Sequence, residues 1–328
     1  MRKPELLVPA SSLEVLKVAV IFGADAVYIG GEVFGLRAKA KNFSMEDMKE
    51  GIAFAHAHGV KVYVTANILA HNRDLAGVRA YFTELKEIGP DALIISDPGV
   101  YRIAMEVCPE IERHISTQAN NTNYGTYQFW YEQGAKRVVT ARELSLEEIW
   151  EIREHIPDLL NAGIDSYKIE GRMKTALYVA TVARTYRKAI DDYLENPKKY
   201  EENMDWYRDQ ISNCTYRQFT TGFFYGKPDH ESQIYDSNTY VKEYTYLGIV
   251  GEQDEQGRYA IEQRNKFSVG EEIEVMKPDG DNVVVTVRGI WDDEGNAMES
   301  APHPKQKLWI DLGVEMDAFD VLRRKEME

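Results

Sequence analysis

Polar side chains that can bind an anion or transfer a proton follow the short apolar runs in the first half of this chain. Residues 165–174 show this best: an apolar run passes directly into Glu170, Gly171 and Arg172, and a helical pattern follows. α/β proteins place their functional groups where a strand passes into a helix. The polar residues that end each apolar run are therefore the candidates for a functional site.

Ten residues at or beside these run ends form the candidate site. Arginine and lysine bind carboxylate or phosphate groups, arginine in a bidentate manner, so their number predicts an anionic substrate. Carboxylates can transfer protons if burial raises their pKa values. The alternative is that these charges pair with one another and only hold loops in place. The candidate catalytic residues are Glu143, Glu170 and Lys168, and the candidate binding residues are Tyr28, Arg37, Asn67, Gln118, Asn120, Arg142 and Arg172.

The elements that must position these residues repeat one pattern, in which a short apolar run alternates with an amphipathic helical stretch. This alternation predicts parallel strands joined by right-handed crossovers. Each run ends in polar residues of its own and no single glycine fingerprint dominates, so a TIM-type (β/α) barrel is favoured over an open sheet. The runs are residues 5–9, 23–30, 59–65, 89–96, 111–117, 134–140 and 164–169.

The predicted barrel is one strand unit short. Between residues 142–144 and the run at 164–169 there is only one helical stretch, residues 146–161. Pro157 lies inside that stretch and should break or kink the helix. A closed eight-stranded barrel needs a further strand here, so the sequence predicts a TIM-type barrel from which one unit is missing.

The character of the chain changes after Leu194. Residues 196–238 are charged and aromatic, and from Tyr240 the apolar residues recur with a period of two, around turns at 278–280 and 293–295. That pattern predicts a small antiparallel β-barrel. The expected domains are a TIM-type barrel over 1–195, a helical and aromatic connector over 196–238, and a C-terminal β-barrel domain over 239–328.

The net charge limits the possible partners. With 39 basic and 54 acidic residues the chain carries −15, which argues against a protein that binds nucleic acid over its whole surface but leaves room for a local basic face. The densest basic cluster is more simply interpreted as a solvated helix face. It consists of Arg172, Lys174, Arg184, Arg187 and Lys188.

Cysteine content and hydropathy exclude further classes. Cys108 and Cys214 lie far apart and cannot form a disulfide framework or an all-cysteine metal site. The mainly apolar stretch at residues 16–22 is too short to span a bilayer, and the N-terminal residues lack a signal-peptide pattern. We therefore expect a cytoplasmic protein with no membrane partner.

At these strand ends the sequence resembles peptidase family U32, the collagenase-like proteases. The resemblance covers nearly the whole chain in order and implies a TIM-type barrel followed by a C-terminal β-domain. It also implies RNA hydroxylation, notably of a tRNA wobble uridine with prephenate as co-substrate; relatives act on ribosomal RNA or a quinone precursor. The segments that carry it are Leu6–Ala10, Ala24–Gly30, Ser116–Gln118, Ala141–Leu144, Tyr167–Arg172, Thr220–Gly226 and Arg264–Gly270.

The resemblance further implies an iron–sulfur cluster, and there the chain departs from the family. The family carries a strand and a cysteine-rich segment between the helix after Ala141–Leu144 and the helix before the strand at 164–169. In this sequence residues 154–156 join those two helices, and neither Cys108 nor Cys214 matches the lost motif. The cysteine ligands of the cluster are therefore absent.

Three functions remain as hypotheses. The first is an RNA-modifying enzyme that binds tRNA or another RNA together with a carboxylate-bearing metabolite such as prephenate, with the β-domain helping to present the RNA. The second is a collagenase-like peptidase in which Glu170, or a water held by Glu143, acts on an amide. The third is a truncated, non-catalytic binding barrel.

Overall fold

The computed structural model describes most of the chain, and no helix within that part is long and apolar enough to cross a membrane. Residues 149–164, where the sequence lacks a strand unit and contains Pro157, lie outside the described residues. The described residues are 3–35, 42–145, 148, 165–171, 174–214, 223 and 243–326.

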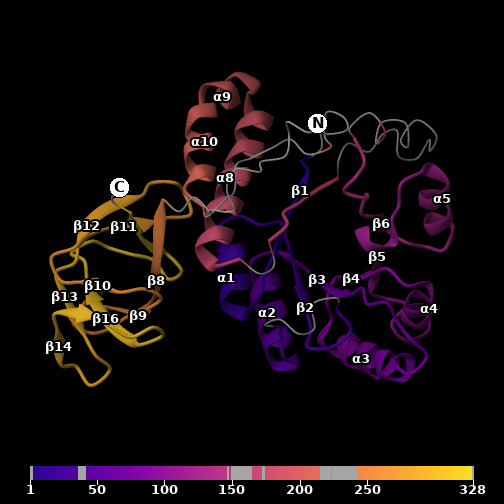
Figure 1. Ribbon diagram of the computed structural model, residues 1–328, viewed down its shortest axis with the longest axis horizontal. Helices are drawn as coiled ribbons and strands as arrows, with labels where there is room; N and C mark the ends of the chain where they lie inside the picture. Colours follow the sequence, from indigo (N-terminus) through magenta and orange to yellow (C-terminus); the bar gives the residue numbers. More distant parts are fainter. Residues whose placement is uncertain are drawn as a thin grey trace, which may run out of the picture. The chain divides into compact units, whose positions relative to one another are not determined.

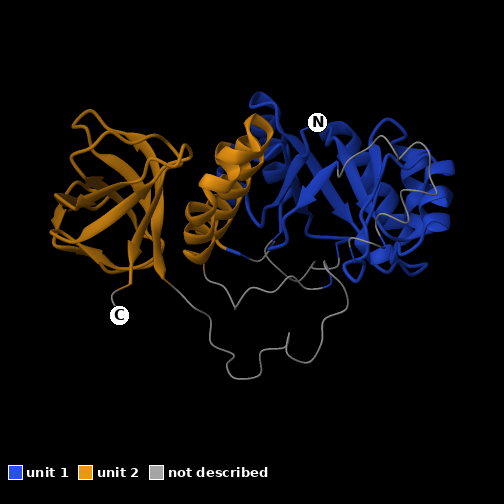
Figure 2. Ribbon diagram, turned by 90° about the horizontal axis from the view of Figure 1, so that it is seen from above, with its two compact units in different colours: residues 1–20, 24–174, 218–238 blue, residues 21–23, 175–217, 239–328 orange. Residues whose placement is uncertain are grey.

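The chain divides into two compact units (Figure 2). The helix that begins after Thr175 belongs to the second unit, whereas the domain boundaries drawn from the sequence placed it with the barrel. The first unit comprises residues 1–20, 24–174 and 218–238, and the second 21–23, 175–217 and 239–328.

The first unit is built on a curled sheet of seven parallel strands in the order β6-β5-β4-β3-β2-β1-β7 (Figure 1). All seven predicted runs form strands of this sheet, which confirms the TIM-type prediction. The strands are β1 (Glu5–Pro9), β2 (Ala26–Gly30), β3 (Lys61–Ala66), β4 (Ala92–Ile95), β5 (Glu112–Ile115), β6 (Arg137–Val138) and β7 (Ser166–Lys168).

Helices connect these strands and begin where the sequence places capping residues. Ser44 accepts a hydrogen bond from the backbone N–H of Asp47 at 3.1 Å and so caps the first turn of α2. Asp97 caps α4 in the same way through the N–H of Val100. The helices are α1 (Leu13–Ile21), α2 (Met45–Ala57), α3 (Leu75–Ile88), α4 (Pro98–Val107) and α5 (Tyr124–Glu132), with a short 3-10 helix η1 (Thr117–Ala119).

One charged residue at the start of β1 links strands from both sides of the curled sheet. The carboxylate of Glu5 accepts hydrogen bonds from Ser166 on β7 at 2.9 Å and from Tyr63 on β3 at 2.7 Å. It also forms a bidentate ion pair with Arg137 on β6, five strands away in the sheet order. His114 on β5 packs edge-on against the ring of Tyr63, with ring centroids 4.7 Å apart. These contacts can form only if the sheet curls.

The protonation states in this cluster follow from its surroundings. Burial alone raises the pKa of Glu5, but the hydrogen bonds and charge of Arg137, with the hydroxyls of Tyr63 and Ser166, outweigh burial and hold the pKa below 4.5. Burial and the charge of Arg137 lower the pKa of His114 to about 4. At neutral pH the cluster therefore contains a carboxylate, a guanidinium and a neutral imidazole.

The second unit begins with three helices. α8 (Ala176–Glu195) matches the predicted helix, with Thr175 as its N-cap. The start of the predicted helical and aromatic connector forms two short helices, α9 (Pro197–Glu202) and α10 (Met204–Ser212). The break falls at Asn203, whose side-chain amide donates to Asp192 on α8 at 2.9 Å.

The predicted basic cluster on α8 does not form a free basic face. Arg184 is 2% exposed and donates to Lys277 O and Asn282 Oδ1 at 2.7 and 2.6 Å. Arg187 and Lys188 form ion pairs with the aspartates four residues later on the same helix. Arg184 is therefore an exception to the prediction of a solvated face, because it is buried.

The rest of the second unit is antiparallel, as predicted. An eight-stranded sheet has the order β12-β11-β17-β8-β9-β16-β13-β14, and β10 pairs with β15. The predicted turn glycines Gly280 and Gly295 have φ of 97° and 86°. The strands are β8 (Tyr244–Gln253), β9 (Tyr259–Glu262), β10 (Phe267–Ser268), β11 (Glu272–Met276), β12 (Val283–Thr286), β13 (Gly289–Trp291), β14 (Ala297–Met298), β15 (Ser300–Ala301), β16 (Lys307–Asp311) and β17 (Val321–Lys325).

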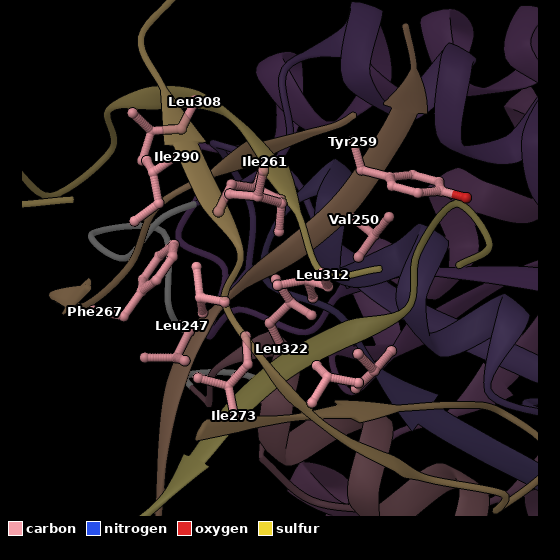
Figure 3. Close-up of a cluster of buried hydrophobic side chains, with 14 of the residues drawn as sticks. Leu247, Val250, Tyr259, Ile261, Phe267, Ile273, Ile290, Leu308, Leu312 and Leu322 are labelled. Carbon is pink, nitrogen blue, oxygen red and sulfur yellow. The ribbon is translucent and has the colours of Figure 1, made fainter. Parts of the chain in front are cut away.

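The antiparallel sheet curves around a core of its own. Figure 3 shows side chains such as Leu247, Ile261 and Leu322 meeting inside it. The alternation of buried and exposed residues along β16 is the period-two pattern seen in the sequence. One face of these strands is therefore apolar and the other meets solvent.

Glu5→Gln should destabilise the first unit by about 3 kcal/mol, because it leaves Arg137 without its charge partner in a largely buried site. The free energy of unfolding, measured by chemical denaturation at neutral pH, checks this. In the wild type the contribution of Glu5 should be present above its ordinary pKa and be lost as the pH falls through its lowered folded-state pKa. The control is Glu50→Gln, which removes the solvent-exposed pair with Lys17 and should have little effect.

Candidate functional site

A pocket of about 70 Å³ lies at the C-terminal ends of the parallel strands in the first unit. Six of the ten candidate residues line it: Tyr28, Asn67, Gln118, Arg142, Lys168 and Glu170. The other lining residues are not among the ten candidates; they are Thr65, Ile94, Ser116, Thr117 and Val139.

The alternation of side chains along each strand explains which residues reach the pocket. Successive strand residues point to opposite faces, so residues two apart share a face. Lys168 lies two residues after Ser166, which contacts Glu5 inside the sheet. Thr65 lies two residues before Asn67, and Ser116 two residues before Gln118. The same spacing, applied backwards from Asn67 and Gln118, would have found Thr65 and Ser116, but it does not give Ile94, Thr117 or Val139.

Glu170 is the centre of charge in the pocket. Its carboxylate contacts Lys168 Nζ, lies 3.5 Å from the guanidinium of Arg142, and accepts from the Tyr28 hydroxyl at 3.2 Å. The Tyr28 hydroxyl also lies 3.0 Å from Ile169 O. Lys168 Nζ lies 4.2 Å from the centre of the Tyr28 ring, within cation–π range. Four pocket groups from β2, β7 and two loops thus fix one another.

The pKa of Glu170 moves downward. Burial raises it, but the charge and hydrogen bond of Lys168, followed by Arg142 and Tyr28, lower it below 4.5. Proton transfer by Glu170 would require a raised pKa, which is the opposite shift. The geometry therefore favours Glu170 as a counter-ion that orients the two cations over Glu170 as a proton donor.

Two cations remain accessible beside this carboxylate. The side chain of Arg142 is 54% exposed and its 3.5 Å contact with Glu170 is long for an ion pair. Lys168 is more enclosed, at 18%. Within the titratable lining, two positive charges face one negative charge, which leaves one unit of positive charge for an anionic ligand. Arg142 is placed to turn toward such a ligand.

The other candidates lie elsewhere. Glu143 is exposed in the turn after Arg142 and does not line the pocket. Asn120 is exposed, with a left-handed φ of 51° at the end of η1, and does not line it either. Arg37 and Arg172 lie outside the described residues. The structure therefore brings six of the ten candidate residues together and places Glu143 and Asn120 outside the pocket.

Two family models match this chain. The model of peptidase family U32 matches residues 11–156 and 153–234, and the model of the family's C-terminal domain matches residues 242–323. The two parts of the first match meet at residues 153–156. That is where the sequence analysis placed the loss of a segment.

Individual relatives agree with these matches. The tRNA hydroxylation protein P1 of Bacillus subtilis (strain 168) is 33% identical over 402 aligned positions, covering 98% of this chain and 95% of that protein. Because 402 exceeds the 328 residues of this chain, that protein has residues with no counterpart here. The tRNA hydroxylation protein P of Escherichia coli (strain K12) is 28% identical over 97% of this chain and 95% of its own length. The 23S rRNA 5-hydroxycytidine C2501 synthase of the same strain is 39% identical over 46% of this chain and 22% of its own length.

The residues of this chain do not fit an iron–sulfur cluster. Such clusters are held by about four cysteine thiolates, and the chain has two cysteines. Cys108 is fully buried in the first unit, where burial raises the pKa of its thiol to about 11, and Cys214 is buried in the second unit. Among the described residues no group of three or more His, Cys, Asp or Glu side chains could hold a metal.

Anaerobic reconstitution with iron and sulfide should therefore leave this chain without stoichiometric cluster iron. Iron analysis and the visible absorption spectrum check this, with a family member that carries the cysteine-rich segment as positive control. Cys108→Ala should give the same spectrum as the wild type. A stable absorption band with matching iron and sulfide content would contradict the prediction.

Proposed function

Because this chain belongs to peptidase family U32, we propose that it acts in the hydroxylation of RNA and binds a carboxylate-bearing small molecule in the pocket around Glu170. The observation that carries the proposal is the meeting of Lys168 and Arg142 at one carboxylate, which leaves the pocket with excess positive charge. The relatives named for tRNA hydroxylation and for 5-hydroxycytidine synthesis supply the reaction class.

The pocket residues would bind the small molecule as follows. A ligand carboxylate would bind the outer side of Arg142 and lie close to Lys168, so that Arg142 contacts Glu170 on one side and the ligand on the other. The side chains of Asn67, Gln118 and Thr117 would donate to its neutral oxygens. Glu170 would hold the cations in place in the absence of ligand.

The finer proposal is that prephenate is the small molecule and a tRNA wobble uridine the target. RNA contact is better assigned to the first unit than to the β-domain, because residues 243–326 contain 10 basic and 19 acidic residues. Basic residues are frequent in the two sequence segments that follow β2 and β7. They are Arg37, Lys39 and Lys41 between β2 and α2, and Arg172 and Lys174 after β7.

Loss of the gene should remove hydroxyuridine from tRNA, which mass spectrometry of digested tRNA measures. The wild-type gene should restore the modification, and Lys168→Met should not, because it removes a cation from the pocket. Lys86→Met is the matched control, since this lysine pairs with Glu110 on the surface away from the pocket.

Two outcomes would favour the other hypotheses. Unchanged hydroxyuridine, together with collagen cleavage that Glu170→Gln abolishes, would indicate a peptidase. Ligand binding without either activity would indicate a binding barrel.

Lys168→Met should also weaken prephenate binding by about tenfold to a hundredfold, the value of a charge-assisted hydrogen bond. Isothermal titration calorimetry of the purified chain measures the dissociation constant, and raising the salt concentration should weaken wild-type binding as well. Lys86→Met should bind like the wild type. Equal affinity for Lys168→Met and the wild type would contradict the proposal that prephenate binds in this pocket.

A further inference from the structure

We infer that Asn121 is a positioning residue of this pocket: it joins the loop after β5 to the loop after β6 and so sets Gln118 against Arg142. The inference rests on the proposed function for the identity of the ligand. Asn121 does not line the pocket, and it lies outside the segments that carry the family resemblance. Its geometry alone identifies it.

Asn121 uses its side chain and its backbone to make three contacts from a fully buried position. Its side-chain Nδ2 donates to Ser116 O at 3.4 Å, and its Oδ1 accepts from the indole Nε1 of Trp130 on α5 at 3.1 Å. Its backbone O accepts from the N–H of Ala141 at 3.2 Å. One residue thus bonds to the end of β5, to α5 and to the loop after β6.

Both loops that Asn121 joins carry pocket residues. Ser116 Oγ accepts from the backbone N–H of Gln118 at 3.2 Å and from Asn67 Nδ2 at 3.4 Å, so Ser116 orients two lining residues. On the other side, Ala141 directly precedes Arg142 and is itself buried. Moving Asn121 would therefore change the positions of a neutral donor and a cation together.

The orientation of the Asn121 amide is determined by chemistry. An indole N–H can only donate, so the atom facing Trp130 must be the amide oxygen. The amide nitrogen then faces Ser116 O and must donate to it. Aspartate has the same shape but has no donor when ionised, and its second oxygen would face a carbonyl oxygen in a buried site.

This difference distinguishes a positioning role of Asn121 from a general contribution to the stability of the fold. A buried aspartate without a cation nearby has a raised pKa. When protonated, Asn121→Asp regains a donor toward Ser116 O. Its binding defect should therefore shrink as the pH falls, whereas a generally loosened fold would bind worse at low pH.

The experiment measures prephenate binding by calorimetry from pH 8 to pH 5 for the wild type, Asn121→Asp and Asn123→Asp. Asn121→Asp should bind about tenfold more weakly at pH 8, the loss of one buried hydrogen bond with its partner left unpaired, and approach the wild type at pH 5. Asn123→Asp is the matched control, because Asn123 is exposed and its side chain caps α5 through Oδ1, an acceptor that aspartate keeps.

A second readout does not depend on the ligand. Amide hydrogen exchange of Asn121→Asp at pH 8 should rise in peptides covering both residues 116–123 and 139–145, and in neither for Asn123→Asp. If the exchange result holds but the wild type does not bind prephenate, the ligand proposal fails and the positioning role stands. Wild-type-like exchange at 139–145 with unchanged affinity would overturn the inference.

Trp130→Phe covers the case in which Asn121→Asp does not fold. It keeps an aromatic ring in the core but removes the indole N–H that donates to Asn121 Oδ1. Binding should weaken by a few-fold without the pH-dependent recovery, because no new titratable group is introduced. Unchanged affinity for Trp130→Phe would also count against the inference.

Discussion

The bidentate pair between Glu5 and Arg137 is the constraint on which the first unit depends. It joins β1 to β6 across the inside of the sheet, while Ser166 brings in β7 and Tyr63 brings in β3. A flat sheet would hold β1 and β6 five strands apart, about 24 Å at the usual strand spacing. Because a buried charge needs its partner, a curled sheet is the arrangement in which this sequence can satisfy both residues.

The pocket lies at the C-terminal ends of the same strands whose side chains form the Glu5 cluster. The side-chain alternation that turns Glu5, Tyr63 and Ser166 inward also turns Thr65 and Lys168 inward, one pair of residues further along their strands. At that end the loops add Arg142 and Glu170, so the charges meet near solvent. One end of the sheet interior thus has a paired ion cluster, whereas at the other end the lining residues that the structure describes carry two positive charges and one negative charge.

The family resemblance implies an iron–sulfur cluster, whereas the residues of this chain do not fit one. The family models cover the first unit and the C-terminal domain, yet the two parts of the first match meet at residues 153–156. The ligand pocket draws its residues from β2 to β7 and does not need the lost segment. The proposed binding of a small anion therefore does not require the cysteine-rich segment, which this chain lacks.

The seven parallel strands, the antiparallel second unit and six lining residues of the pocket could be predicted from the amino-acid sequence, because hydrophobic period and turn chemistry are local properties. The sequence did not reveal the break at Asn203, the burial of Arg184 or the pKa of Glu170. The first two depend on residues elsewhere in the chain, Asp192 for Asn203 and Asn282 for Arg184. The pKa of Glu170 depends on burial, which raises it, and on Lys168 and then the distant Arg142 and Tyr28, which lower it. Only the tertiary structure decided them, since hydrogen bonding and desolvation act through space and leave no period in the sequence.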